Sequence, residues 1–518
     1  MDRLGYVGAI RAAVSELRGA ATVFGDRETS WPEMLDRAAR VAGGLRAMGL
    51  ERGDRVAVLS PNSDLYLLLY LAISWAGGVI APLNVRWSAA EIRHALEDCT
   101  PAIAFVGGCS DLEILSIFEA REKATIPVSL DGTGGLSRLR FEDLVGAEPI
   151  DDAGLGGEDL FGIFYTGGTT GRAKGVMLSH AGVVGNAMAM RDMGLFPAHA
   201  RALLVTPLFH MAAVAAQTMA FLAGGESVIL PAFDPGKALD AIAEHRITDA
   251  LLVPTMIQMV LDVPGFEPGK LTTLRRIMYG ASPMTESTLD RAMAAAPHVD
   301  FLQCYGMTEL SPTAVMLTPE FHRGEHRKAG RHRGAGRPIR GVEVRIADES
   351  GNPIPPGEVG EVLVRSPGMM LGYWNQPEQT AEVLIDGWMH TGDGGRIDDH
   401  GVLYVVDRIK DMIVSGAENV YSAEVESVLS QHPDIAQCAV IGVPDARWGE
   451  RVHAVIVARP GTEVTIEGVM AHCKGLIAGY KCPRSIELRP ALPMSAAGKI
   501  LKGDLRGPYW EGQGRNVA

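Results

Sequence analysis

Residues 163–176 read IFYTGGTTGRAKGV, an apolar segment that runs into glycines and threonines and then a lysine. Glycine lets the backbone curve closely around an anion, consecutive N–H groups can form an anion-binding nest, and threonine hydroxyls add further donors. Lys174 can neutralise phosphate charge. The run is not the P-loop pattern G-x-x-x-x-G-K-S/T, because Gly175 follows Lys174. The stretch therefore predicts a strand that leads into a phosphate-binding loop.

Around this loop, helical patterns alternate with short apolar runs. Residues 31–48 (WPEMLDRAARVAGGLRAM) have the spacing of a helix, whereas residues 55–59 (RVAVL) and 102–106 (AIAFV) are typical of strands. Strands that alternate with helices predict a largely parallel α/β sheet. The alternation returns between residues 202 and 278, which predicts a second α/β subdomain.

The pattern changes after about residue 330, where the strand-like runs VEVRIAD, GEVLVRS and GVLYVVD lie between Gly, Pro and Asp turns. These runs predict a β-rich subdomain. Beyond Lys410, a helix over residues 422–431 and strands over 437–443 and 452–458 predict a small α+β unit. The predicted fold class is α/β, with a large N-terminal domain of α/β subdomains plus a β-rich subdomain and a small, mobile α+β C-terminal domain.

Composition and charge narrow the function classes. The 518 residues are 47% hydrophobic and 21% charged, which is typical of a globular protein of at least two domains. The 48 Lys and Arg against 62 Asp and Glu give a net charge of −14, which argues against non-specific binding to nucleic acid or anionic membranes. The six cysteines form no C-x-x-C pair, so neither a zinc site nor a disulfide framework is predicted.

One apolar run, residues 65–83, is long enough to raise the question of a membrane span. Gly77, Gly78 and Pro82 interrupt it, so we expect a buried helix, a glycine turn and a short core strand instead. The first twenty residues are interrupted by charges and lack the apolar core of a signal peptide. We therefore expect a cytoplasmic protein without an integral membrane span.

Four more motifs follow the loop in order. Residues 305–309 read YGMTE, 391–393 read TGD, 407–411 read DRIKD and 493–499 read PMSAAGK. Together with YTGGTTGRAKG, they closely resemble the signatures of the adenylate-forming superfamily, which includes acyl-CoA synthetases, nonribosomal-peptide adenylation domains and firefly luciferase. The five matches extend from residue 165 to residue 499, so the resemblance covers nearly the whole chain.

The resemblance implies a nucleotide site and assigns its residues. The implied ATP- and AMP-binding positions are Thr166, Gly167, Gly168, Thr169, Thr170, Gly171, Lys174, Gly280, Ala281, Ser282, Tyr305, Gly306, Thr308, Asp393, Arg408 and Lys499. Tyr305 is expected to pack on the adenine, and Thr308 to contact the α-phosphate. Asp393 and Arg408 are expected to bind the ribose hydroxyls.

The implied catalytic residues are Lys499, Thr308, Glu309 and His210. Lys499 ends PMSAAGK, and its ammonium can bridge the substrate carboxylate and the α-phosphate as pyrophosphate leaves. The implied cofactor is Mg²⁺, held by Glu309 and Thr166, since hard oxygen donors suit a hard cation. Lys410 matches the hinge about which the C-terminal domain rotates. The resemblance also implies a lysine acetyltransferase as a partner that silences the enzyme at Lys499, because acetylation removes its charge.

His210 in TPLFHMAAV falls where acyl-CoA synthetases carry an aromatic residue or His beside the carboxylate pocket; an ordinary core histidine is the alternative. Amino-acid adenylation domains place an aspartate in this segment, and PLFHMAAVAAQ has no carboxylate, which argues against a free amino acid. A pocket built from residues 209–216, Gly224, Met256 and residues 279–281 is apolar and rich in small residues. It suits a medium- or long-chain fatty acid, with a benzoate- or cinnamate-type acid as the alternative.

Residues 412–425, MIVSGAENVYSAEV, resemble the run ISGGENIYPAEIE that lines the pantetheine channel in CoA ligases. The implied CoA-binding residues are Ser415, Gly416, Ala417, Glu418, Asn419 and Trp448. Two positions depart from the family run, since Ala417 replaces a glycine and Ser422 replaces a proline. If close backbone approach needs that glycine, Ala417 narrows the channel.

These features together predict an ATP-dependent, AMP-forming acid–CoA ligase, with an AMP-binding domain over residues 1–408 and a C-terminal domain over 409–518. Its expected partners are a carboxylic acid, ATP and CoA, without nucleic acid; a homodimer is compatible with the sequence. A stand-alone adenylation enzyme that loads a carrier protein stays open, as does a non-catalytic protein on the same fold. The joint presence of five predicted reactive residues argues against a non-catalytic protein. These residues are Lys174, Glu309, Asp393, Arg408 and Lys499.

Overall fold

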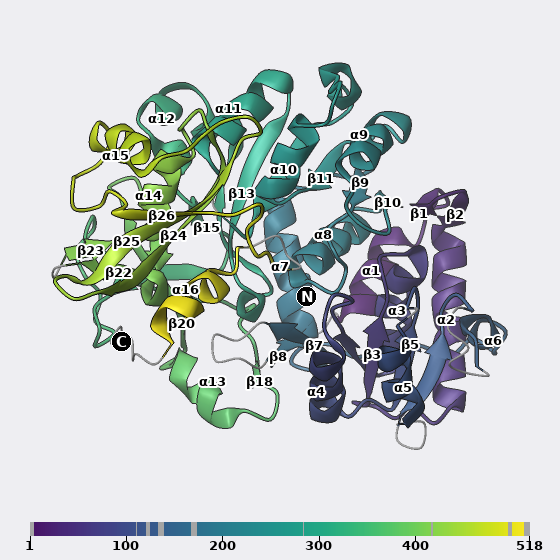
Figure 1. Ribbon diagram of the computed structural model, residues 1–518. Coiled ribbons are helices and arrows are strands. Elements are labelled where there is room, and N and C mark those ends of the chain that lie inside the picture. Colours follow the sequence, from purple (N-terminus) through teal and green to yellow (C-terminus); the bar gives the residue numbers. More distant parts are fainter. Residues whose placement is uncertain are drawn as a thin grey trace.

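Four β-sheets organise the chain in a computed structural model that describes residues 5–109, 111–120, 125–132, 139–166, 173–282, 284–415, 418–495 and 500–511 (Figure 1). Two large sheets of mainly parallel strands come first, a smaller antiparallel sheet follows, and the last sheet forms from the C-terminal part. This order confirms the predicted α/β class with a β-rich subdomain and a small C-terminal α+β domain.

The seven-stranded sheet runs in the order β18-β8-β7-β4-β3-β5-β6. Its strands are β3 (Arg55–Leu59), β4 (Val79–Pro82), β5 (Ile103–Val106), β6 (Ile126–Ser129), β7 (Leu160–Thr166), β8 (Lys174–Ser179) and β18 (Gly372–Tyr373). The helices of this region are α2 (Trp31–Ala47), α3 (Asp64–Trp75), α4 (Ala89–Cys99), α5 (Leu112–Ala120) and α6 (Phe141–Val145). All residues of α3 are buried, as expected where helices pack on a parallel sheet.

The nine-stranded sheet runs in the order β15-β14-β13-β12-β11-β9-β10-β1-β2. Its strands are β1 (Ala20–Phe24), β2 (Arg27–Ser30), β9 (Arg201–Leu204), β10 (Glu226–Ile229), β11 (Asp249–Leu251), β12 (Arg276–Gly280), β13 (Asp300–Gly306), β14 (Thr313–Leu317) and β15 (Arg337–Pro338). Its helices are α1 (Tyr6–Val14), α7 (His180–Asp192), α8 (Met211–Leu222), α9 (Pro235–Glu244), α10 (Pro254–Leu261), α11 (Glu286–Ala295) and α12 (Gly324–Lys328). Strands β13, β12, β11, β9, β10 and β1 are parallel.

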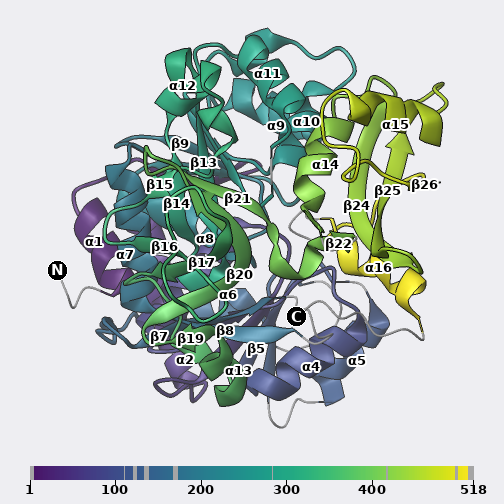
Figure 2. The same ribbon diagram turned by 90° about the vertical axis from the view of Figure 1, so that its left-hand side faces the viewer.

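The third sheet is antiparallel and consists of β16 (Glu343–Ala347), β17 (Gly360–Arg365), β19 (Leu384–Ile385), β20 (Trp388–Ile397) and β21 (Leu403–Arg408), with α13 (Pro377–Val383) beside it. The C-terminal sheet consists of β22 (Ile413–Ser415), β23 (Glu418–Val420), β24 (Ile435–Asp445), β25 (Gly449–Ala458) and β26 (Ser485–Leu488). Helices α14 (Ser422–Leu429), α15 (Ile466–Lys474) and α16 (Lys502–Trp510) pack with it. Figure 2 shows this unit, in yellow-green, to one side of the other sheets.

The apolar run 65–83 forms what its interruptions predict, namely the buried helix α3, a turn at Gly77 and the core strand β4. None of the helices in the described ranges has the length and apolarity needed to span a bilayer. All six cysteines are free thiols.

His180 gives the fold a testable pH dependence. It is fully buried at the start of α7, its Nδ1 accepts the backbone N–H of Tyr6 at 3.2 Å, and burial lowers its pKa from 6.5 to about 4. A histidine with a depressed folded pKa stabilises the fold above its unfolded pKa and loses that contribution as the pH falls from 6.5 to 4. We expect His180→Asn, which keeps an acceptor but cannot charge, to remove about 3 kcal/mol of the acid-induced fall in unfolding free energy. Denaturant titrations at pH 4.5 to 7.5 measure this slope, and the exposed-residue variant His400→Asn should leave it unchanged.

Candidate active site

The residues predicted for the adenine and for the acid lie at one edge of the nine-stranded sheet. In the order β13-β12-β11-β9, Tyr305 lies at the end of β13, Gly280 ends β12, and the segment with His210 follows β9. Neighbouring strands are about 4.8 Å apart, so these strand ends lie within about 15 Å of one another. The carboxyl ends of parallel strands are where open α/β sheets bind ligands. The structure thus brings the two predicted subsites together.

A hydrogen-bonded triad joins this edge to the third sheet. The Tyr305 hydroxyl donates to Asp393 Oδ2 at 2.7 Å, and Arg408 Nε lies 2.7 Å from Asp393 Oδ1. Asp393 and Arg408 are direct cross-strand partners in β20 and β21, which explains their ion pair. Burial and the Asp393 charge raise the pKa of Tyr305 well above its usual value, so its hydroxyl remains a donor. A carboxylate oriented in this way can accept hydrogen bonds from a vicinal diol.

The backbone beside Tyr305 is tightly packed. Gly280 pairs with Cys304 across β12 and β13, and a Cβ on Gly280 would lie 2.3 Å from the Cys304 carbonyl oxygen. The next residue, Ala281, has φ 66°, so the chain turns sharply after the strand. Only glycine allows this approach at residue 280. Residues 280–282 therefore present backbone rather than bulky side chains next to Tyr305.

Glu309 and Lys174 both contact Tyr373, a residue that the sequence motifs did not single out. Glu309 lies in a short turn of 3₁₀ helix after β13, is 6% exposed, and accepts a hydrogen bond from the Tyr373 hydroxyl at 2.9 Å. Lys174 Nζ lies 4.9 Å from the centre of the Tyr373 ring. Burial and the Glu309 charge raise the pKa of Tyr373, which keeps it a donor. The sequence signal for Tyr373 is only the GYWN run of residues 372–375, which by itself indicates a turn or a strand end.

The two ends of the phosphate loop are held by strand pairing, because Thr166 of β7 and Lys174 of β8 are cross-strand partners. Thr308 opens the 3₁₀ turn that carries Glu309, and Lys410 lies in the short turn between β21 and β22. Predicted site residues that fall outside the described residues are Gly167, Gly168, Thr169, Thr170, Gly171, Gly416, Ala417 and Lys499.

The donor set fits the implied Mg²⁺. Glu309 offers a buried carboxylate at the end of β13, and Thr166 offers a hydroxyl at the end of β7. A chain of contacts links them, since Thr166 pairs with Lys174, Lys174 lies on the Tyr373 ring, and Tyr373 donates to Glu309. Mg²⁺ usually takes one or two protein oxygens together with substrate phosphates, which matches this sparse set.

His210 lies in a loop that both large sheets hold in place. The Leu208 N–H donates to Asn62 Oδ1 at 2.8 Å, and the Tyr70 hydroxyl donates to the Leu208 carbonyl at 2.7 Å. The His210 ring packs against Phe209 with ring centres 4.7 Å apart, directly before α8. Asn62 and Tyr70 lie about 140 residues upstream, so no local pattern reveals their role.

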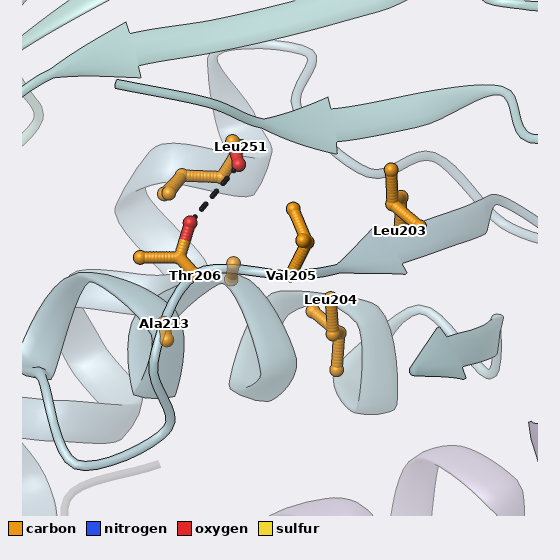
Figure 3. A pocket seen from close by; sticks show the side chains of 7 residues that line it. Leu203, Leu204, Val205, Thr206, Ala213 and Leu251 are labelled. Carbon is orange, nitrogen blue, oxygen red and sulfur yellow. Dashed lines mark hydrogen bonds between the residues drawn. The ribbon is translucent and has the colours of Figure 1, made fainter. Parts of the chain in front are cut away.

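A narrow, mainly apolar space lies near this loop. Residues 203–206, Ala213, Ala216 and Leu251 line a space between β9, β11 and α8 that is too narrow for a water molecule (Figure 3). The Thr206 hydroxyl donates to the Leu251 carbonyl at 3.2 Å across it. The sequence predicts Gly224 in the acid pocket, but Gly224 lies away from His210. Helix α8 begins directly after His210 and is about 18 Å long, and Gly224 follows its far end. A Cβ on Gly224 would lie 2.3 Å from Leu17.

The described residues predicted to meet CoA gather at one end of the C-terminal sheet. Ser415 pairs with Glu418 in β23 and with Gly449 in β25, so the turn with Trp448 lies beside them. The Arg447 and Arg484 guanidinium groups lie 4.6 Å and 5.4 Å from the Trp448 ring centre. Glu418 and Asn419 are exposed. The two guanidinium groups beside this half-buried indole offer positive charge for a nucleotide diphosphate.

Sequence reasoning singled out Trp448 but missed the two arginines. Arg447 is its neighbour in the chain, so the ARWGE run carries a local signal. Arg484 is brought to the ring only by the tertiary fold.

The comparisons with known proteins agree with this geometry. Residues 11–374 match the AMP-binding enzyme family model, and residues 424–499 match the AMP-binding enzyme C-terminal domain. A feruloyl-CoA synthase from an Amycolatopsis species is 40% identical over 96% of this chain and 97% of its own length. ScoC of Streptomyces coeruleorubidus, a fatty acid–[acyl-carrier-protein] ligase, is 36% identical over 95% of this chain and 93% of its own length. The crystal structure of ATP-bound MatB from Rhodopseudomonas palustris, 31% identical, matches 98% of this chain and 99% of its own with a TM-score of 0.88. The chain belongs to the AMP-binding enzyme family and is an acid–thiol ligase.

Proposed function

We propose that the protein is an ATP-dependent, AMP-forming ligase that converts an aryl carboxylic acid to its CoA thioester through an acyl-AMP intermediate. The observation that carries the proposal is the Tyr305–Asp393–Arg408 triad, placed at the sheet edge beside the loop of His210. One end of that edge suits a ribose and an adenine, and the other suits an apolar acid.

In the first half-reaction, the substrate carboxylate attacks the α-phosphate of ATP and pyrophosphate leaves. Residues 166–174 hold the phosphates, Thr308 contacts the α-phosphate, and Lys499 stabilises the charge that develops. Mg²⁺ bound at Glu309 and Thr166 would neutralise charge on the phosphate oxygens. Tyr373 orients both Glu309 and the Lys174 ammonium toward this reaction.

In the second half-reaction, the thiol of CoA attacks the acyl-AMP carbonyl and AMP leaves. We assign the boundary between the domains to residues 408–409 and the pivot to Lys410. Rotation about this pivot withdraws Lys499 and brings residues 415–419 and Trp448 to the acyl-AMP, so that one cavity serves both steps. The TM-score of 0.88 to ATP-bound MatB, against 0.79 to the apo structure of that protein, supports an arrangement suited to the first step.

The narrow space that residues of β9, β11 and α8 line supports a compact aryl acid rather than a long aliphatic chain as the substrate. The identity of 40% to a feruloyl-CoA synthase supports the same class. The small residues Ala212, Ala213 and Ala216 at the start of α8 favour a fatty acid of medium length as the second candidate.

Pyrophosphate release with ATP, CoA and a panel of acids tests the proposal. We expect a hydroxycinnamate or benzoate to give a kcat/KM at least about tenfold above octanoate, hexadecanoate and free amino acids, since one apolar pocket discriminates over roughly this range. A preference for hexadecanoate would overturn the aryl assignment. Release that requires a holo-carrier protein instead of CoA would identify a stand-alone adenylation enzyme, and no release with any acid would contradict catalysis altogether. Homodimerisation, acetylation of Lys499 and a cytoplasmic location stay predictions.

A further inference from the structure

A buried polar cluster spans the proposed pivot at Lys410. Asp407 lies in β21 before the pivot, and Ser422 opens α14 after it. The Ser422 hydroxyl donates to Asp407 Oδ2 at 2.6 Å, and the Ser422 backbone N–H donates to the same oxygen. Ser422 is fully buried and Asp407 is 9% exposed. The cluster therefore contains two hydrogen bonds to a carboxylate that connect the two sides of the pivot.

The same serine also contacts the last helix of the chain. Lys502 Nζ donates to the Ser422 hydroxyl and lies 2.8 Å from Glu426 Oε1, with side chains that are 15% and 20% exposed. Burial alone would lower the pKa of Lys502, but the carboxylates of Glu426 and Asp407 raise it overall, so the lysine stays charged.

The helix of Lys502 makes a second ion pair within the C-terminal domain. Arg506 of this helix pairs with Asp411 at 2.9 Å. Lys502 itself follows Lys499 by three residues.

These contacts respond differently to a rotation about Lys410. Lys502, Glu426, Arg506 and Asp411 all follow the pivot, so their ion pairs move together with the C-terminal domain. The two bonds from Ser422 to Asp407 connect residues on opposite sides, so they must break when the domain turns. Hydrogen bonds to a charged group are stronger than neutral ones.

We propose that Ser422 is a positioning residue whose N–H and hydroxyl hold Asp407 across the pivot and thereby favour the domain arrangement in which acyl-AMP forms. The inference rests on the proposed function, since it assumes two half-reactions and a pivot at Lys410. A proline at residue 422 would offer neither donor.

Two substitutions of Ser422 remove one or both of the hydrogen-bond donors to Asp407. Ser422→Ala removes the hydroxyl and keeps the N–H, whereas Ser422→Pro removes both donors. The backbone angles accept a proline, since residue 422 is the first of α14 and Tyr421 before it is extended, with φ −85° and ψ 119°. The proline Cδ would take the place of the N–H that faces Asp407, so the carboxylate has to move away from residue 422. Ser430→Ala is the matched control, because Ser430 closes the same helix and its hydroxyl donates only locally, to the Ser427 carbonyl at 2.8 Å.

The test measures both half-reactions of the full-length enzyme. Acyl-dependent ATP–pyrophosphate exchange reports the first, and thioester formation from supplied acyl-AMP and CoA reports the second. We expect exchange to fall about fivefold in Ser422→Ala and at least about tenfold in Ser422→Pro, while thioester formation stays within twofold or rises. Asp407→Asn should add little exchange loss to Ser422→Pro, because the proline has already removed both bonds that Asp407 accepts from residue 422.

Other results would overturn the inference. Equal loss of both half-reactions would show a general structural role, unchanged exchange in both serine variants would show that the bonds do not matter, and equal loss in Ser430→Ala would show an effect of the helix alone. Should Ser422→Pro fail to fold, Ser422→Ala carries the same comparison. Absence of exchange in the unmodified enzyme with every acid would instead contradict the proposed function, so the two failures are distinguishable.

Discussion

Lys499→Ala should lower the rate of acyl-AMP formation by at least about 100-fold while leaving thioester formation from supplied acyl-AMP within about threefold. A cation delivered to the site where charge develops acts on the transition state of the first step, and removal of one such group typically costs two to three orders of magnitude. In the function that we propose, the second step uses the other domain arrangement, with Lys499 withdrawn. ATP–pyrophosphate exchange measures the first half-reaction, and thioester formation from supplied acyl-AMP measures the second.

Control variants separate charge at residue 499 from general effects on the C-terminal domain. Lys474→Ala makes the same change at an exposed lysine at the end of α15, and it should leave both half-reactions unchanged. Lys499→Gln, which imitates acetylation, should behave as Lys499→Ala, because both remove the charge. Equal loss of both half-reactions in Lys499→Ala would refute the role assigned to this residue.

The parts of the fold that local patterns specify could be predicted. Strand β3 matches its predicted range, and α2 ends one residue earlier than expected. The pairing of distant segments could not be predicted, because it depends on tertiary packing rather than on periodicity. Strand β1 joins β10, about 200 residues later, and the two-residue strand β18 extends the first sheet beside β8. Strands as short as β18 carry almost no sequence signal.

The candidate site shows the same division. Motifs located Tyr305, Asp393 and Arg408, because each lies in a short run with a distinctive order of residues. Tyr373 and Arg484 escaped, since a lone tyrosine or arginine is ordinary until the fold places it against a charge or a ring. Gly224 was placed in the wrong region, because closeness in sequence to α8 says nothing about which end of a helix meets the pocket.

Asp393→Ala should raise the KM for ATP by at least about tenfold without a comparable change in the KM for the acid. Asp393 is buried and fixed by Tyr305 and Arg408, so its oxygens are oriented before ATP binds. Loss of hydrogen bonds to a charged acceptor costs about 1.5–3 kcal/mol each, which corresponds to a tenfold or larger change in affinity. Tyr305→Phe should have the smaller effect, because it removes one donor to Asp393 and retains the ring that is expected to pack on the adenine.

The nucleotide analogue 2′,3′-dideoxy-ATP distinguishes ribose binding from a structural role. The unmodified enzyme should prefer ATP by at least about tenfold in kcat/KM, because the analogue leaves the Asp393 carboxylate without the hydroxyls that it would bind. In Asp393→Ala, the preference should fall to about twofold or less, since the group that reads the hydroxyls is gone. A merely structural aspartate would weaken both nucleotides equally and leave the ratio intact, which would contradict the assignment. Asp393→Asn should lie between the two, because its amide can accept from Arg408 while donating to the Tyr305 oxygen, but carries no charge.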